Sequence, residues 1–179
     1  MTAAESRVES RALLDRLDQH LRRMSARGVL FGQAVADRLG IGASDLECLD
    51  LINLKGRVTA GELAAATGLT TGAITGVLDR LEKAGFIKRE RDAADRRKVF
   101  ASIRPAALQK IAPLYQPLDR AMRELWSRYS REELELLIDF AARCEEVFTR
   151  EIARLRENDP RRRGARPARK AKSKTAGGE

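Results

Sequence analysis

The sequence predicts a mainly helical protein that carries one small β-hairpin. Three observations in residues 59–103 support this prediction. A capping box opens a short helix at Thr59, an apolar stripe marks a second helix close behind it, and two β-rich segments follow around a charged turn. Two helices joined by a tight turn and followed by a hairpin form a winged helix-turn-helix.

Each element of this region has its own local signal. Thr59 and Glu62 have the T-x-x-E spacing of a capping box, and either Thr70 or Thr71 caps the second helix. The hairpin strands are expected over 86–91 and 98–103, with a short third strand at Arg57-Val58 beside them. The apolar stripe of the second helix repeats at i, i+3, i+4 and i+7 through Ile74, Val77, Leu78 and Leu81.

The opposite face of the second helix carries two glycines. At about 100° per residue this exposed face holds Gly72, Thr75, Gly76, Asp79 and Lys83. A glycine inside a helix costs about 0.8–1 kcal/mol relative to alanine. A helix tolerates this cost where another surface must approach its backbone, and the major groove of DNA is such a surface. The alternative is a helix whose glycines have no function.

These residues also carry a family resemblance. The stretch from about Leu39 to Pro105 resembles the MarR family of winged-helix transcriptional regulators, through RLGIGASDLECLDLI, the segment TAGELAAATGLTTGAITGVLDRLEKAGFIKRERDAADRRKVFASI and its Asp95-Arg96-Arg97. The order of helices extends the resemblance over most of 10–156. It implies an obligate dimer that binds palindromic operators in double-stranded DNA and releases them when a small-molecule effector binds. One departure is Arg104 before Pro105, where a Ser or Thr often caps the helix.

The candidate DNA-binding residues lie in two places. The recognition helix contributes Thr70, Thr71, Gly72, Thr75, Gly76 and Arg80. The wing contributes Arg91, Asp95, Arg96, Arg97 and Lys98, for an adjacent minor groove or the phosphate backbone. By match to the family's D-x-R motif, Asp95 orients Arg97 through a salt bridge. The alternative for the basic residues, Arg89 and Arg91 included, is a solvated hairpin.

The helices on either side of this head are expected to form a dimerisation platform over about 5–39 and 105–157. The first is one helix kinked near Gly28, or two helices with a short joint. The second carries an a/d seam from Leu108 to Tyr129, interrupted by Pro113 and Pro117, so it is either kinked or broken. A capping box at Ser130 opens the last helix. The candidate dimer contacts are Leu14, Leu17, Leu21, Leu118, Met122, Leu125, Leu137 and Phe148.

Residues 1–159 therefore form one domain, with its winged head at about 43–104. A second capping box, Ser44 with Glu47, is expected to open the first helix of the head, which buries leucines as far as Leu54. Cys48 and Cys144 match no metal spacing, and packing in the core is expected for both, with a redox sensor as the alternative. The lone His20 is expected to be a surface or interface residue and not a ligand or a base.

The net charge of +9 is concentrated at the end of the chain. Residues 160–179 hold eight basic residues and one acidic residue, so 1–159, with 27 basic and 25 acidic residues, have a net charge of +2. This segment lacks an apolar face, so a disordered basic tail is expected, which adds affinity for DNA without specificity. We find neither a signal peptide nor a transmembrane segment, so a cytoplasmic protein without membrane contact is expected.

The function expected from these features is a dimeric, sequence-specific regulator, most simply a repressor. An enzyme is not expected, because the sequence has one His, no nucleophile elbow, no phosphate loop and no Cys/His/Asp/Glu cluster. For the same reason no cofactor and no metal site is expected, and no residue pattern names a small-molecule ligand. The alternative function is a non-specific architectural DNA-binding protein.

Overall fold

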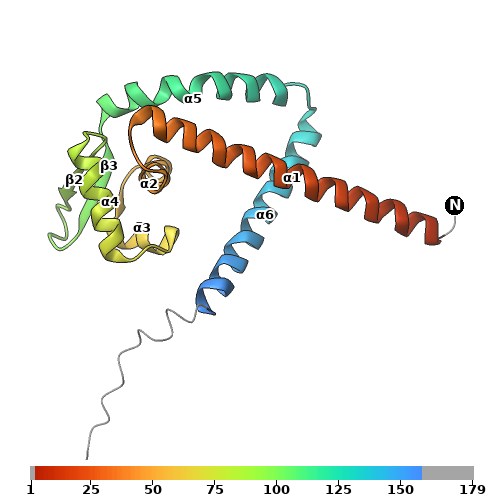
Figure 1. Ribbon diagram of the computed structural model, residues 1–179, viewed down its shortest axis with the longest axis horizontal. Helices are drawn as coiled ribbons and strands as arrows, with labels where there is room; N and C mark the ends of the chain where they lie inside the picture. Colours follow the sequence, from red (N-terminus) through yellow and green to blue (C-terminus); the bar gives the residue numbers. More distant parts are fainter. Residues whose placement is uncertain (1–2, 159–179) are drawn as a thin grey trace, which may run out of the picture. The chain divides into compact units, whose positions relative to one another are not determined.

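The computed structural model describes residues 3–158, and by internal contacts the chain divides into residues 1–120 and 121–179, each described here by itself. Most of the described residues are helical, and a small antiparallel sheet interrupts the helices (Figure 1), which confirms the predicted fold class. The elements are α1 (Ala3–Leu39), α2 (Ala43–Lys55), β1 (Val58–Thr59), α3 (Ala60–Thr67), α4 (Thr71–Lys83), β2 (Ile87–Arg91), β3 (Val99–Ile103), α5 (Pro105–Trp126) and α6 (Arg131–Glu157).

Helix α1 is a single helix that runs through both of its glycines. It continues past Gly28 and Gly32 to Leu39, so the alternative of two helices with a joint is wrong. Near its C-terminal end Val35 and Ala36 are buried together with Leu46 of α2. This contact fixes the end of α1 against the head, and it compensates for the weak helix propensity of glycine.

Helix α2 begins one residue before the predicted cap. Gly42 is the N-cap, in an extended conformation and without a side-chain hydrogen bond, so the prediction of a capping box at Ser44 is wrong. Ser44 lies in the first turn, and Asp45 beside it is buried and takes part in an ion pair described below. Leu54, predicted to be buried, is 81% exposed in the last turn.

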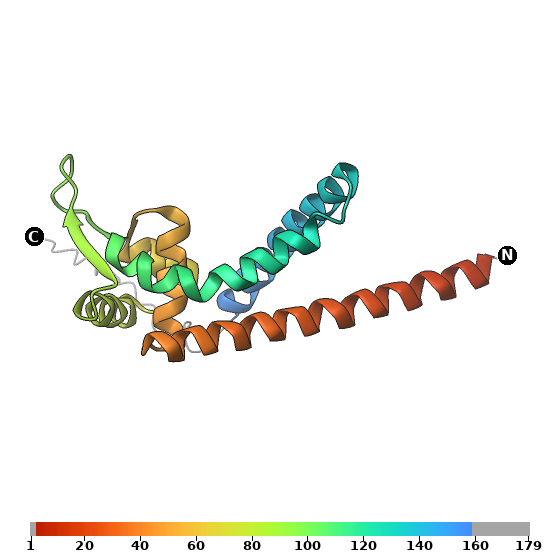
Figure 2. The same cartoon turned by 90° about the horizontal axis from the view of Figure 1, so that it is seen from above.

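The three strands form one sheet in the order β1-β3-β2. Val58 pairs with Ala101 across β1 and β3, and Arg91 pairs with Val99 at the far end of β2 and β3. The pairing confirms the predicted hairpin, and the third strand is present one residue later than predicted, at Val58–Thr59, so that Arg57 lies before it. Figure 2 shows the hairpin loop extending away from the helices of the head.

The core of the head is shared by all its elements. Its fully buried large side chains are Leu49, Ile52, Val58, Leu63, Ile74, Leu81 and Ile87. Cys48 is buried among them, as predicted. Burial raises the pKa of its thiol to about 11, so the thiol stays protonated and unreactive at neutral pH. Cys144 in α6 is partly exposed, so the prediction of a core position is wrong for this residue in the single chain.

Helix α5 contains both prolines without a break. It starts at Pro105, where the missing backbone N–H has no cost, and Pro113 and Pro117 lie within it. It ends at Trp126, so Tyr129, the predicted end of the seam, lies outside the helix. The Ser130 capping box of α6 is confirmed: the Ser130 hydroxyl accepts from the Glu133 N–H, and the Glu133 carboxylate accepts from the Ser130 N–H.

Two further expectations concern the basic tail and membrane contact. The basic tail, 160–179, lies outside the described residues. Within residues 3–158, no helix has the length and apolar character needed to cross a membrane.

Candidate nucleic-acid interface

The recognition helix α4 is held by one face and open on the other. Thr70 is its cap, and its hydroxyl oxygen accepts from the Ala73 N–H at 3.2 Å. This decides between the two threonines proposed from the sequence. The predicted stripe is the buried face of the helix, formed by Ile74, Val77, Leu78 and Leu81.

The open face of α4 carries two glycines, although the structure has room for a side chain at both positions. A Cβ atom built on Gly72 meets nothing within 4 Å, and one built on Gly76 meets only Nη1 of Arg80 at 3.5 Å, an ordinary contact. Thr71 and Thr75 are exposed beside them, and the Thr75 hydroxyl donates to the Thr71 carbonyl at 2.9 Å. Packing within the chain therefore does not explain why this face carries glycines.

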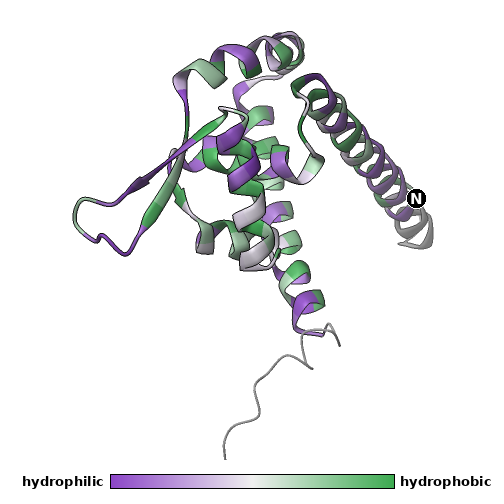
Figure 3. Cartoon of the chain, turned by 60° about the vertical axis from the view of Figure 1, so that its left-hand side comes forward, coloured by the Kyte–Doolittle hydropathy of each residue, from purple (hydrophilic) through white to green (hydrophobic). Residues whose placement is uncertain are grey.

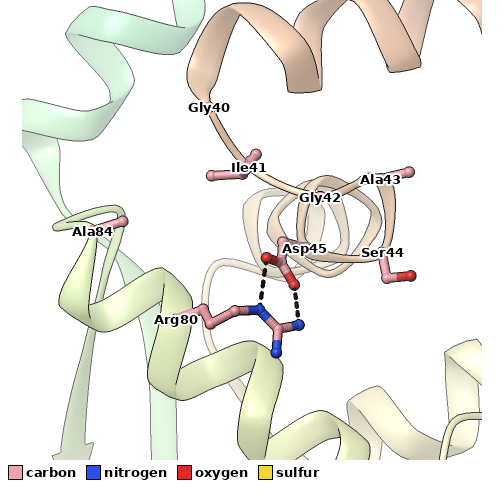
Figure 4. Close-up of a pocket in the computed structure, with 8 residues that line it drawn as sticks. All are labelled: Gly40, Ile41, Gly42, Ala43, Ser44, Asp45, Arg80 and Ala84. Atoms are coloured by element: carbon pink, nitrogen blue, oxygen red, sulfur yellow. Dashed lines mark hydrogen bonds and ion pairs between the residues drawn. The ribbon is translucent and has the colours of Figure 1, made fainter.

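Arg80 extends from beside Gly76 to α2, where it pairs with Asp45, and its side chain remains 61% exposed. Its Nε donates to Oδ2 of Asp45 at 3.0 Å, and its Nη2 donates to Oδ1 at 2.6 Å (Figure 4). The Asp45 side chain is only 6% exposed, so this two-point pair ties the recognition helix to α2. The hydrogen bonds raise the pKa of Arg80. Asp45 was missed from the sequence, because its partner is 35 residues away.

A shallow cavity of about 390 Å³ lies around this ion pair, between the start of α2 and the end of α4. The glycine-rich turn at Gly40–Gly42 forms one wall, and Ala84 lies on the other side (Figure 4). The two charged side chains that line the cavity satisfy each other. It therefore presents no uncompensated charge to a ligand.

A second set of ion pairs connects α4 to the wing. Arg89 of β2 contacts Asp79 at 2.7 Å and Glu82 at 2.6 Å, both on α4. The hydrogen bond from the Arg89 side chain holds the pKa of Glu82 below its usual range. Arg89 is thus not part of a merely solvated hairpin.

The wing loop is built by backbone hydrogen bonds to two aspartates. Oδ1 of Asp92 accepts from the N–H groups of Ala94 and Asp95, both at 2.9 Å. Oδ1 of Asp95 accepts from the backbone N–H of Arg97 at 3.1 Å. Asp95 has no ion pair with the Arg97 guanidinium in the part of the chain that the structure describes, so the predicted salt bridge is wrong. The four cations predicted for the wing are all exposed: Arg91, Arg96, Arg97 and Lys98.

The predicted dimer contacts are apolar residues that the single chain leaves uncovered. Leu14 and Phe148, on α1 and α6, are 66% and 67% exposed. Apolar and polar residues alternate along the coloured part of α1 (Figure 3). The remaining six residues are exposed or half-buried: Leu17, Leu21, Leu118, Met122, Leu125 and Leu137.

A capped helix, a tight turn, a recognition helix and an antiparallel wing define the winged helix-turn-helix class. The MarR family model matches residues 41–99. The uncharacterized HTH-type transcriptional regulator YcgE of Bacillus subtilis is 41% identical over 139 residues, which cover 78% of this chain and 90% of YcgE. The chain therefore belongs to the MarR family of transcriptional regulators, which are not enzymes.

Solved structures share the fold at lower sequence identity. The transcriptional regulator Tm0710 of Thermotoga maritima is 24% identical with a TM-score of 0.55, covering 78% of this chain and 98% of that one. A mutant MarR from E. coli, complexed with operator DNA, is 20% identical with a TM-score of 0.50, covering 72% of this chain and 93% of that one. At these identities the likeness establishes the fold alone.

Proposed function

We propose that this chain is a dimeric, sequence-specific DNA-binding repressor that recognises a palindromic operator. The observation that carries the proposal is the open face of α4, where Gly72 and Gly76 leave the backbone accessible without any internal reason. A recognition helix with a bare patch can lie deeper in a major groove than one covered by side chains. The complex of the E. coli MarR mutant with operator DNA supports this use of the fold.

Within α4, Thr71 and Thr75 are the proposed contacts with base edges and phosphates. Both are exposed next to the glycines. Thr70 and Arg80 have supporting roles instead, since the first caps the helix and the second is paired with Asp45. The reading surface is therefore narrower than the set of residues that the sequence suggested.

The wing supplies the proposed electrostatic contacts. Arg91, Arg96, Arg97 and Lys98 are exposed at the outer end of the hairpin. Cations at this position can contact phosphates or enter the minor groove beside the major groove that α4 occupies. Such contacts fix the orientation of the head and strengthen binding to every sequence alike.

Dimerisation is proposed through α1, α5 and α6, the predicted platform of about 5–39 and 105–157. These helices carry most of the exposed large apolar side chains of the described chain. Covering such faces with a second copy removes apolar area from water. A two-fold dimer would place two recognition helices about 34–36 Å apart, one turn of DNA, which matches a palindrome.

Footprinting on genomic DNA tests the proposal. Discrete protected palindromes are expected, whereas continuous coverage would favour the alternative of an architectural protein. Thr75→Ala should change preference at one or two base pairs in each half-site. Arg97→Ala should weaken operator and random DNA alike and lower the slope of log K against log[salt] by about 1. Arg131→Ala, which removes an exposed cation of α6, is the matched control and should leave both properties unchanged.

An effector that releases the operator completes the proposal, as the family resemblance implies. Its test is a screen of small molecules for loss of the footprint at fixed protein concentration. A compound that acts through the protein should shift its melting temperature at the concentration that abolishes the footprint. A compound that abolishes the footprint without shifting the melting temperature would act on the DNA and not through the protein.

A further inference from the structure

Arg57 lies in the connection between α2 and β1 and contacts two other elements. Its Nη2 donates to Oδ2 of Asp92 at 2.8 Å, just beyond the end of β2. Its Cζ lies 4.0 Å from the centroid of the Phe100 ring in β3. Phe100 is paired with Thr59 of β1 on one side and with Glu90 of β2 on the other. One guanidinium group therefore joins the base of the wing to the strand that anchors it.

Asp92 is the residue through which this contact reaches the wing loop. Its side chain is 15% exposed, and its second oxygen, Oδ1, accepts from two backbone N–H groups of the loop. Its own N–H donates to the Lys98 carbonyl at 2.9 Å. The hydrogen bonds that the carboxylate accepts from the Asp95 and Ala94 N–H groups, together with that from Arg57, hold the pKa of Asp92 below its usual range. All three hydrogen bonds that the Asp92 carboxylate accepts therefore hold the wing loop and its base in place.

We propose that Arg57 and Asp92 form a clamp that positions the wing cations Arg96, Arg97 and Lys98 against DNA. The inference rests on the proposed DNA-binding function and deepens it, since it assigns positioning roles to two residues outside the predicted reading set. The loop that carries the three cations begins at Asp92, and its path is set by the hydrogen bonds at this residue.

The chemistry of the clamp requires arginine at position 57. A guanidinium can stack its plane on an aromatic ring and donate in its own plane at the same time. A lysine ammonium carries the same charge but lacks this planar geometry. If Arg57 were only a phosphate contact, the charge alone would decide its contribution, and lysine would replace it.

Whether removing the Asp92 charge raises or lowers DNA affinity distinguishes a positioning role from simple electrostatic repulsion. Removing a negative charge close to DNA raises affinity when the charge only repels phosphates. A clamp predicts the opposite result. In Asp92→Asn, Oδ1 can still accept from the loop, but an amide nitrogen replaces the oxygen that faces Arg57 and cannot accept a hydrogen bond.

The experiment measures operator affinity across a salt series for the full-length protein and four variants. Asp92→Asn and Arg57→Lys are each expected to weaken binding about two- to fivefold, the range for a partly exposed ion pair. The salt slope should fall by about 0.9 for each phosphate contact that the wing loses. The double variant should bind like either single variant, because both remove the same clamp. Glu90→Gln, which removes a neighbouring exposed acid, is the control and should bind equally well or more tightly.

Two outcomes overturn the clamp while leaving the proposed function intact. One is tighter binding by Asp92→Asn, to the level of Glu90→Gln. The other is an unchanged affinity and salt slope for Arg57→Lys. Thermal melts of all variants establish that binding is measured on folded protein, and a loss of stability alone does not alter the salt slope of the folded fraction. If the unaltered protein shows no salt-dependent binding to duplex DNA, the proposed function fails, and the clamp fails with it.

Discussion

The winged head and the terminal helices use their apolar residues in different ways. Helix α4 buries four side chains in 13 residues, and together with α2, α3 and the sheet it closes a core within one chain. Helix α6 has 27 residues and buries none of its side chains, although apolar residues such as Phe148 recur along it. The head thus has a complete core of its own, whereas α6 presents an amphipathic face that needs a covering surface.

The ion pairs differ in the same way. In the head, Arg80 with Asp45 and Arg57 with Asp92 each join residues 35 positions apart. In α6, Arg131 with Glu135 and Arg143 with Asp139 are one helical turn apart. Local pairs of this kind stabilise a helix by about 0.3–0.5 kcal/mol and say nothing of its neighbours. The ion pairs of the head therefore fix its segments relative to one another, whereas those of α6 lie within a single helix and do not fix it against any other element.

The largest effect is expected from changing the uncovered faces. Leu118→Asp combined with Leu125→Asp should give a monomeric or insoluble protein with little operator binding, because placing two carboxylates in an apolar interface costs several kcal/mol. Sedimentation checks the oligomeric state. Gln109→Asp with Gln116→Asp adds the same charges at exposed polar positions of α5 and should leave it unchanged. A leucine double variant that remains a dimer would place the interface elsewhere.

Substitutions in the core of the head should lower its free energy of unfolding, whereas substitutions at its exposed positions should have little effect. Leu81→Ala, at a fully buried position, should lower the free energy of unfolding by about 2–5 kcal/mol. Leu54→Ala, at the exposed end of α2, should change it by less than about 0.5 kcal/mol. Urea denaturation of both variants measures the difference. Equal losses would contradict the boundary of the core drawn here.

Gly72→Ala should have opposite effects on the stability of α4 and on operator binding. The open space around Gly72, the second residue of α4, predicts that alanine stabilises the helix by less than the value of about 1 kcal/mol for a helix interior. The added methyl group should at the same time weaken operator binding, since it occupies the approach to the groove. Melting temperature and operator affinity, measured on the same preparation, check both signs. Tighter or unchanged binding by Gly72→Ala would show that the glycine is not needed for close approach.

A small, pH-dependent effect is expected at the link between α4 and the wing. The pKa of Glu82 is lower in the folded state than in the unfolded chain, so its contribution to stability is present above the unfolded pKa and is lost as the pH falls through the folded pKa. Glu82→Gln should therefore cost less than about 1 kcal/mol at pH 7 and almost nothing at strongly acidic pH. Unfolding curves at both pH values check this, and a loss that is equal at both would exclude the ionised contact as its cause.

The local elements of this protein could be predicted from short windows of its sequence. The capping boxes at Thr59 and Ser130 were predicted and are confirmed. The apolar stripe of α4 and the hairpin were also predicted and are confirmed. These features depend on spacings of three or four residues in helices and two in strands, so a short window of sequence contains all the information needed.

Tertiary structure decided the features in which distant residues compete for one position. Ser44 and Glu47 have the spacing of a capping box, but the helix starts at Ala43 and buries Asp45 against Arg80. The family resemblance implied a salt bridge between Asp95 and Arg97, but the Asp95 carboxylate accepts from the loop backbone. The partner of a charged side chain depends on which segments the core brings together, and a contact across 35 residues leaves no periodic trace in the chain.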